Sequence, residues 1–459
     1  MRAILGALVL YWMASVPSHA LDLSEAYQLG LSNDPVVLQT EAKRNAAQKN
    51  KPIGIARLLP SVSFNGNLVE NHLVTGKSPI FVQAYTDYVF WSGQFTLTLT
   101  QPLFHYDTWV QLWQADNQLA QAEAQLQAEY QNLAIRVARS YFQILLAEDN
   151  LEVSTAELRS LESQITQVKE RLALGFSTVV DLDEVQAQHD KVVADRILYD
   201  QQLNDAKAAL REIIGDRELD LVKVPDELPL LQPEPADLAA WRTTALQHNL
   251  AIIAALSGAE IAKQNIDLNF AGHLPTVDLQ GIKSMADTNR PFGLQTDMEN
   301  IGVYLTVPIY SGGGVNARVE QARDAYEQAL HEVDRQRRAA ERQVADAYRG
   351  VFSAIGRVGA LKTALASAQR AVEATEMGFR VGTRTAVDVL VEQTKMFATR
   401  RDYAKARYDY LINGLLLKQA AGTLTRSDID AVNGLLHRRR RGVEPAVTTP
   451  LRHEAAVHP

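Results

Sequence analysis

The chain has 459 residues, a formal net charge of −8 and no cysteine. The lack of cysteine excludes a disulfide framework, a thiolate metal site and a cysteine-borne lipid anchor at the N-terminus. The modest negative charge argues against a nucleic-acid partner.

The first 20 residues have the pattern of a secretory signal peptide. Arg2 provides a basic start, residues 4–13 form an apolar stretch, and Ser18-His19-Ala20 is a small-x-small cleavage site. The apolar stretch is too short to span a bilayer. We therefore expect export with cleavage after Ala20. No later run is long and apolar enough to predict a membrane-spanning helix.

The first part of the mature chain predicts two helices and two strands. We expect a short amphipathic helix over residues 21–33, then a helical stretch to about residue 59 that Pro52 kinks or interrupts. Residues 61–69 and 94–103 alternate apolar and polar side chains, which is the period of a half-exposed strand. The aromatic-rich segment between these strands, with Phe81, Tyr85, Tyr88, Phe90 and Trp91, predicts a loop.

A very long helix follows. Residues 107–174 contain neither proline nor glycine, and leucine recurs every seven residues as in a coiled-coil seam. The seam leucines are Leu112, Leu119, Leu126 and Leu133, with Ala115 and Ala122 between them. At 1.5 Å per residue this helix is about 100 Å long. Gly175 ends it, and a second helix is predicted over residues 179–214.

Residues 221–235 form a proline-bearing linker, after which the pattern returns. The predicted elements are a helix over 236–271, a strand from Thr276, a strand over 301–309, and helices over 315–380 and 387–421 on either side of Gly382. Pro102, Pro308 and the pair Gly312-Gly313 mark the exits from sheet to helix. The tail carries four arginines at 438–441 and is expected to be disordered.

The chain therefore contains one unit twice, because three motifs recur at a spacing of about 206 to 215 residues. Leu59-Pro60-Ser61-Val62 returns as Leu274-Pro275-Thr276-Val277, Gln101-Pro102-Leu103-Phe104 as Val307-Pro308-Ile309-Tyr310, and Gly175 with Asp181 as Gly382 with Asp388. The expected organisation is a signal peptide (1–20), a first repeat (21–235), a second repeat (236–430) and a tail (431–459).

Four short strands beside four long helices predict a mixed α and β membrane protein. Strands with one apolar face suit a lipid-facing outer-membrane barrel with a polar lumen. Four strands cannot close, and lipid does not tolerate an open sheet edge, so chains must associate. Three chains would give about twelve strands, enough for an aqueous lumen, with the helices continuing as a shared cylinder of antiparallel coiled coils below the membrane. The alternative is a structural, periplasm-spanning coiled-coil protein without an open channel.

The segments around the second hairpin resemble the TolC-like outer-membrane channel-tunnels, the outer membrane factor family. The matching segments are 379–390 (FRVGTRTAVDVL), 406–413 (ARYDYLIN), 422–424 (GTL) and 307–310 (VPIY) followed by Gly312-Gly313. The resemblance covers essentially all of residues 21–430.

The resemblance implies a homotrimer with a twelve-stranded barrel, four strands per chain, and a long periplasmic helical tunnel. It also implies a periplasmic adaptor (membrane fusion) protein and an inner-membrane pump of the RND, ABC or MFS type. The duct would export drugs or unfolded proteins, and its periplasmic tip would open like an iris.

The resemblance further implies a polar network that holds the tip closed. Carried over by position, Arg384 would pair with Asp181 and Glu170, a charge-assisted arrangement suited to a guanidinium and carboxylates. Phe379 stands where the family usually has a tyrosine. Thr178 with Asp181, and Thr385 with Asp388, also have the pattern of capping boxes, and the two roles are compatible.

Asp388 matches a family aspartate that points into the tunnel. Three such carboxylates around a three-fold axis would attract cations. A second acidic ring of the family is replaced here by Val391, and Glu392 lies on a different helical face.

No pattern for catalysis is present. The ten histidines are scattered without metal-ligand spacing, and no nucleophile motif or phosphate-binding loop occurs. We therefore expect neither an enzyme nor a metal or other cofactor.

Overall fold

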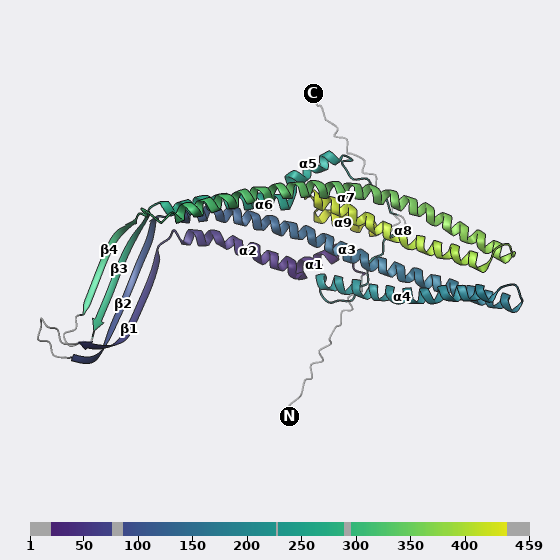
Figure 1. Ribbon diagram of the computed structural model, residues 1–459, viewed down its shortest axis with the longest axis horizontal. Helices are drawn as coiled ribbons and strands as arrows, with labels where there is room; N and C mark the ends of the chain where they lie inside the picture. Colours follow the sequence, from purple (N-terminus) through teal and green to yellow (C-terminus); the bar gives the residue numbers. More distant parts are fainter. Residues whose placement is uncertain (1–19, 76–85, 226–227, 289–294, 438–459) are drawn as a thin grey trace, which may run out of the picture. The chain divides into compact units, whose positions relative to one another are not determined.

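The computed structural model describes residues 20–75, 86–225, 228–288 and 295–437 (Figure 1). Its elements are α1 (Leu23–Asn33), α2 (Pro35–Ala56), β1 (Ser61–Thr75), β2 (Thr86–Phe104), α3 (Tyr106–Ala173), α4 (Val179–Ile214), α5 (Leu238–His248), α6 (Leu250–Phe270), a 3-10 turn (Ala271–His273), β3 (Thr276–Thr288), β4 (Thr296–Thr306), α7 (Gly314–Arg380), α8 (Ala386–Ala420) and α9 (Arg426–His437). Among these residues, none of the helices is both long and apolar enough to cross a membrane.

The chain divides into two compact units that do not coincide with the two sequence repeats. The sheet unit comprises residues 39–129 and 244–342, and the hairpin unit comprises the residues up to 38, 130–243 and those from 343 on. The helices α2, α3, α5 and α7 contribute to both units because each crosses a boundary. Each unit is described separately below.

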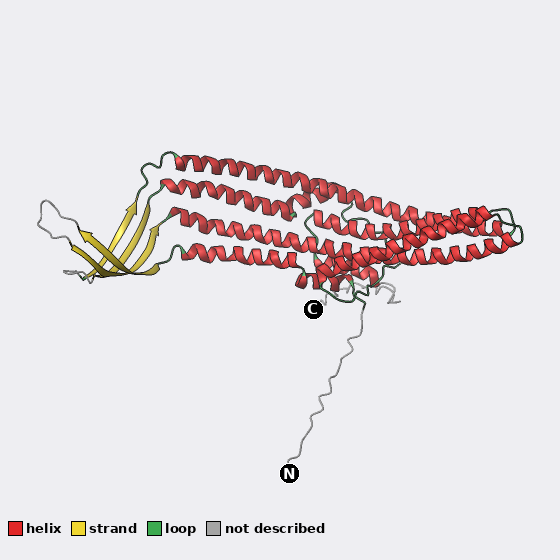
Figure 2. Ribbon diagram, turned by 60° about the horizontal axis from the view of Figure 1, so that its bottom comes forward, coloured by secondary structure: helices red, strands yellow, loops and turns green. Residues whose placement is uncertain are grey.

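The sheet unit contains a four-stranded antiparallel sheet in the order β1-β2-β3-β4 (Figure 2). Phe64 of β1 lies opposite Leu97 of β2, Leu97 opposite Lys283 of β3, and Lys283 opposite Glu299 of β4. The register shifts between Pro102 and Phe104, where the proline cannot donate to the ladder.

The two faces of the sheet differ in chemistry. One face exposes apolar side chains, including Val62, Phe64, Phe95, Leu97, Leu99, Ile301, Val303 and Leu305. The other face is richer in polar side chains, although Met298 and Val69 are exposed there: the Thr96 and Ser284 hydroxyls lie 3.2 Å apart, and Gln94 also bonds Ser284. Ile301 is 76% exposed in the chain, which is far from the burial expected of a soluble core.

Three helices of the sheet unit pack side by side through polar and small residues. On one side of α3, the amide of Asn50 in α2 donates to Gln118 Oε1 at 2.6 Å. On the other side, Gln114 Nε2 donates to Asn265 Oδ1 of α6 at 2.8 Å. A Cβ added at Gly54 would lie 3.2 Å from Leu112 Cδ1, so the glycine permits the close approach of α2 to α3.

The hairpin unit is held together around Tyr141 of α3, which is fully buried. Its hydroxyl lies 3.0 Å from the carbonyl oxygens of Leu21 and Val222, the ends of two segments joined by a bridge between Leu21 and Leu221. Burial raises the pKa of Tyr141 well above its ordinary value, so the hydroxyl stays protonated and available as a donor.

The strands are longer than the alternation predicted. β2 begins at Thr86, so Tyr88, Phe90 and Trp91 belong to a strand and not to a loop, whereas Phe81 and Tyr85 lie outside the described residues. β4 covers Thr296–Thr306 and ends before Pro308, because a proline there cannot continue the ladder. Gly312 and Gly313 follow with φ of 61° and 78° and turn the chain into α7.

Pro52 lies inside α2, so it does not interrupt the helix, and the kink expected as the alternative stays a prediction. Two other helix expectations were wrong. The predicted helix over 236–271 is two helices, because Asn249 caps α6 by accepting bonds from the backbone N–H groups of Ala251 and Ile252. Residues 431–437, expected to be part of a disordered tail, belong to α9; residues 438–459 lie outside the described residues.

Candidate functional site

The candidate site is the pair of hairpin ends, α3–α4 and α7–α8, in the hairpin unit. Gly175 and Gly382 terminate the long helices with φ of 76° and 82°. Nothing lies within 4 Å of a Cβ built on either glycine, so backbone conformation and not space explains their presence.

Both second helices of these hairpins begin with a complete capping box. Asp181 Oδ2 accepts from Thr178 N at 2.7 Å, and Thr178 Oγ1 accepts from Asp181 N at 3.1 Å. Asp388 Oδ2 accepts from Thr385 N at 2.9 Å, and Thr385 Oγ1 accepts from Asp388 N at 3.1 Å. Each carboxylate therefore satisfies backbone groups at the start of its own helix.

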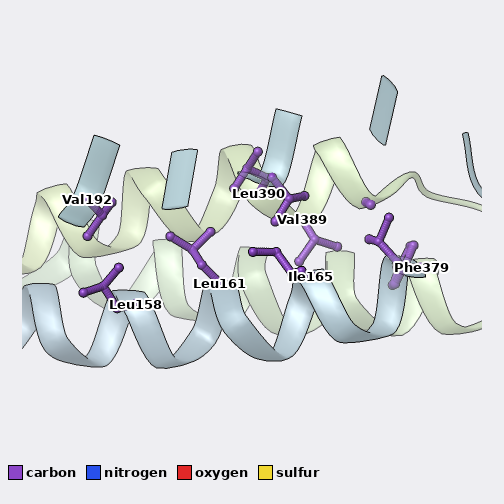
Figure 3. Close-up of a cluster of buried hydrophobic side chains, with 10 residues drawn as sticks. Leu158, Leu161, Ile165, Val192, Phe379, Val389 and Leu390 are labelled. Carbon is purple, nitrogen blue, oxygen red and sulfur yellow. The ribbon is translucent and has the colours of Figure 1, made fainter. Parts of the chain in front are cut away.

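The two hairpins pack on each other through a buried apolar cluster (Figure 3). Its members are Leu158, Leu161, Ile165 and Val168 of α3, Val185 and Val192 of α4, Phe379 of α7, and Ala386, Val389 and Leu390 of α8. The cluster joins segments about two hundred residues apart in sequence, so it holds the second hairpin against the first.

Arg171, near the end of α3, binds Phe379 in two ways. Its guanidinium carbon lies 4.4 Å from the centroid of the phenyl ring, a cation–π contact, and its Nη1 donates to the Phe379 carbonyl oxygen at 3.0 Å. Within the described part of the chain, the buried Nε of Arg171 has no hydrogen-bond partner. The contact is therefore specific but leaves one donor unsatisfied, at a cost in free energy.

Further polar contacts join α3 to the second hairpin. Gln164, 4% exposed, donates to the carbonyl oxygen of Ala386 at 3.2 Å. Ser160 donates to Gln393, whose amide donates to Glu376 at 2.9 Å. These bonds lie beside the apolar cluster and add geometric specificity to it.

One ion pair lies farther along the same helices. Arg401 Nη1 of α8 lies 2.8 Å from Glu157 Oε2 of α3, and the Glu157 side chain is only 4% exposed. Because this ion pair is largely buried, removing either Arg401 or Glu157 would leave the other charge without its partner.

The sequence interpretation missed Arg171, Gln164 and Glu157 as contact residues. All three fall on the seven-residue series that starts at Ala115 and Ala122, the second seam position of α3. Extending that series would have found them, because a polar residue at a seam position must meet a partner on the facing helix.

The structure does not bring the predicted gate residues together within one chain. Arg384 and Glu170 are exposed, and among the described residues no ion pair joins Arg384 to Asp181 or Glu170. Arg384 instead lies over Gly378, where an added Cβ would be 2.7 Å from Arg384 Cγ. Phe379, the remaining member of the predicted network, is buried against Arg171.

The carboxyl group of Asp388 keeps its negative charge to a lower pH than an ordinary aspartate does. Hydrogen bonds from the backbone N–H and the hydroxyl of Thr385 lower the pKa of Asp388 below its ordinary value, and the positive charge of Arg384 adds to this effect. Val391, one turn farther along α8, is 43% exposed, and Glu392 pairs with Lys395 at 2.8 Å.

Across the residues that the structure covers, no group of three or more histidine, cysteine, aspartate or glutamate side chains could hold a metal ion. The apolar cluster and the polar contacts beside it are helix–helix contacts, suited to holding or releasing a hairpin.

A family model described as outer membrane efflux protein matches residues 26–216 and 241–423, which is most of the chain. The chain belongs to the outer membrane efflux protein family. It is 33% identical to the outer membrane protein TolC of Vibrio cholerae over 421 residues, covering 90% of this chain and 93% of that protein. The proteases secretion protein PrtF of Dickeya chrysanthemi is 28% identical over 434 residues, covering 93% and 94%.

The fold agrees with that assignment. The outer membrane protein VceC of Vibrio cholerae superposes with a TM-score of 0.72 at 20% identity, covering 87% of this chain and 96% of VceC. The predicted resemblance and the outer-membrane location are thereby confirmed, and the chain is an outer-membrane channel protein of an efflux and secretion family.

Proposed function

We propose that three copies of this chain form an outer-membrane exit duct. The observation that carries the proposal is the four-stranded sheet with an exposed apolar face, whose edge strands β1 and β4 have no further partner in the described sheet. Lipid does not tolerate unpaired edges, so other copies must complete the sheet. Three copies supply twelve strands, enough to enclose an aqueous lumen, whereas a small barrel fills with side chains.

In this assembly, each of the two repeats, 21–235 and 236–430, supplies two strands and one helical hairpin. The helices extend into the periplasm as one tunnel and meet a periplasmic adaptor and an inner-membrane pump. The names of TolC and of the proteases secretion protein PrtF support efflux or type I secretion as the setting. The cargo is a small toxic compound or an unfolded protein.

Assembly is tested on the detergent-extracted, full-length protein. Light scattering should give the mass of a trimer, and planar bilayers should show discrete cation-permeable channels. A monomeric or dimeric mass would contradict the barrel. A stable trimer without conductance, even after the gate substitution below, would favour the structural coiled-coil alternative.

We infer that the gate network lies between neighbouring copies, because one chain does not join its members. Arg384 is exposed at the hairpin end, and so is Glu170, while Asp181 is half-buried in its cap. We infer that Arg384 of one copy meets Asp181 and Glu170 of the next, which would hold the tip closed through charge-assisted bonds.

Arg384→Ser should therefore raise single-channel conductance several-fold, because removing one partner of a desolvated pair leaves the other unpaired. Arg380→Ser is the matched control, since Arg380 is also exposed and lies four residues away. Unchanged conductance of the Arg384→Ser trimer, or an equal rise for both variants, would refute the lock.

A further inference from the structure

The expected first residue of the mature chain is buried in the hairpin unit. Cleavage after Ala20 would make Leu21 the N-terminal residue, and Leu21 is only 8% exposed. Its backbone nitrogen donates to the carbonyl oxygen of Asp220 at 2.6 Å, and its carbonyl oxygen accepts from Val222 N at 3.2 Å. The first residues of most domains are poorly ordered unless a specific contact holds them. Leu21 is therefore held in place by its own backbone.

The start of the mature chain is also fastened to the helices α1, α3 and α9. The hydroxyl of Tyr141 in α3 lies 3.0 Å from the carbonyl oxygen of residue 21. Asp22 caps α1 by accepting from Glu25 N at 2.7 Å, and Leu23 N donates to Asn433 Oδ1 of α9 at 3.2 Å. Three helices and the segment 219–222 thus meet at the first three residues of the mature chain.

The surroundings of this terminus carry an excess of negative charge. Burial raises the pKa of the Tyr141 hydroxyl, and three nearby carboxylates raise it further. Burial also raises the pKa of Glu148, one of those three, and two more carboxylates add to this rise while two lysines oppose it. The carboxylates are those of Asp22, Glu25, Glu148, Asp149 and Asp220, and the lysines are Lys207 and Lys223. A further positive charge at this place would be stabilised.

Cleavage would create such a charge at Leu21 N. In the structure this nitrogen belongs to the peptide bond with Ala20, and its one hydrogen is used in the bond to the Asp220 carbonyl oxygen. Hydrolysis by a signal peptidase adds one water: its oxygen goes to the Ala20 carbonyl carbon, which leaves as a carboxylate, and both hydrogens end on Leu21 N. The product is an ammonium group with three donors, charged at pH 7 because the ordinary pKa of an α-amino group is about 8.

The burial of Leu21 also determines when the bond can be cut. Because the residue is buried and its nitrogen is hydrogen-bonded, a peptidase cannot reach this bond once the hairpin unit has folded. Cleavage must therefore precede the folding of this unit. The hairpin unit then folds around an N-terminus that is already charged.

We propose that the surroundings of Leu21 N form a binding site for the chain's own α-ammonium group, which cleavage of the signal peptide creates. The ammonium donates to the carbonyl oxygen of Asp220, and the surrounding carboxylates, with Glu148 among them, stabilise its charge. This proposal rests on the expected cleavage after Ala20 and not on the barrel. Charge-assisted bonds are stronger than neutral ones, so the processed chain holds the segment 219–222 more firmly than the precursor does. Correct processing is then a condition for a fully stable hairpin unit.

The test compares two N-termini of the same chain, each released from a fusion by a site-specific protease and refolded into detergent. One form begins at Leu21. The other begins at Ser18, so that Leu21 N stays an amide and the positive charge lies three residues away. The structure accommodates the peptide bond between Ala20 and Leu21, so the longer form should fold. Hydrogen exchange is followed by mass spectrometry on peptides that cover residues 219–224, and peptides from 158–168 in the apolar cluster report that the unit is folded.

The Val222 N–H should exchange about tenfold faster in the form that begins at Ser18, because the charge-assisted bond beside it is lost. Glu148→Gln should speed this exchange in the form that begins at Leu21, but leave it unchanged or slower in the longer form. Glu162→Gln is the matched control, since Glu162 is an exposed carboxylate on the same helix. It should change neither form.

Equal exchange of the two forms would overturn the proposal, and so would an equal effect of Glu148→Gln on both. The readout lies in the hairpin unit and needs no membrane. Failure of this proposal is therefore distinguishable from failure of the duct, which light scattering and conductance test.

Discussion

Asp388→Asn should abolish block of the channel by trivalent cations added from the periplasmic side. We propose that Asp388 from three copies forms a ring in the tunnel lumen. Three carboxylates in such a confined lumen concentrate cations, and the Thr385 hydrogen bonds that lower the pKa of Asp388 keep each carboxylate charged at neutral pH. The expected change is a loss of blocker affinity of about tenfold or more in planar-bilayer recordings, without change in the trimer mass. The resemblance implies a second acidic ring at the position of Val391, so we expect a lower affinity for the blocker than in a two-ring relative.

Thr385→Ala separates the ring from the cap. This variant removes the hydroxyl that Asp388 N binds but leaves the carboxylate in place. Its free energy of unfolding should be lower than that of the parent by roughly 0.5–2 kcal/mol, the contribution of a lost cap, so it should melt at a lower temperature. It should nevertheless retain the block. Block that persists in Asp388→Asn would show that Asp388 only caps its helix.

The block should also weaken in acid. The folded-state pKa of Asp388 is lowered, so the carboxylate stays charged as pH falls past the ordinary aspartate value, and the charge is lost only below that. Repulsion among three carboxylates opposes this shift in the assembled ring.

Arg171→Ala should free the end of α7 and raise conductance several-fold. The substitution removes both the stacking on Phe379 and the bond to its carbonyl oxygen, together worth about 2–4 kcal/mol. Arg171→Lys should have an intermediate effect, because lysine keeps the charge but not the planar group that stacks. Single-channel recording of assembled trimers measures each effect.

Phe379→Leu completes a double-mutant cycle. It removes the ring but leaves the carbonyl oxygen, so its effect should be smaller than that of Arg171→Ala and not additive with it. Additive effects, or wild-type conductance for Arg171→Ala with an intact trimer, would show that this contact is only structural.

The candidate site was predictable only in part. The sequence interpretation placed Asp181 and Asp388 in capping boxes, and the structure shows both, because a cap is made within four residues. It did not find Arg171, whose partner Phe379 lies 208 residues away. The pairing of Arg384 with Asp181 and Glu170 stays a prediction, because it involves a second copy of the chain.

The sequence by itself determined the long helices and their ends. Heptad spacing without proline or glycine over 107–174 predicted α3 almost to the residue, and Gly175 and Gly382 mark turns that need positive φ. The break at Asn249 is a local cap that the sequence contains and the periodicity did not reveal. Only the tertiary structure decided the strand lengths, because they depend on pairing with residues distant in sequence, and local periodicity does not encode the partner.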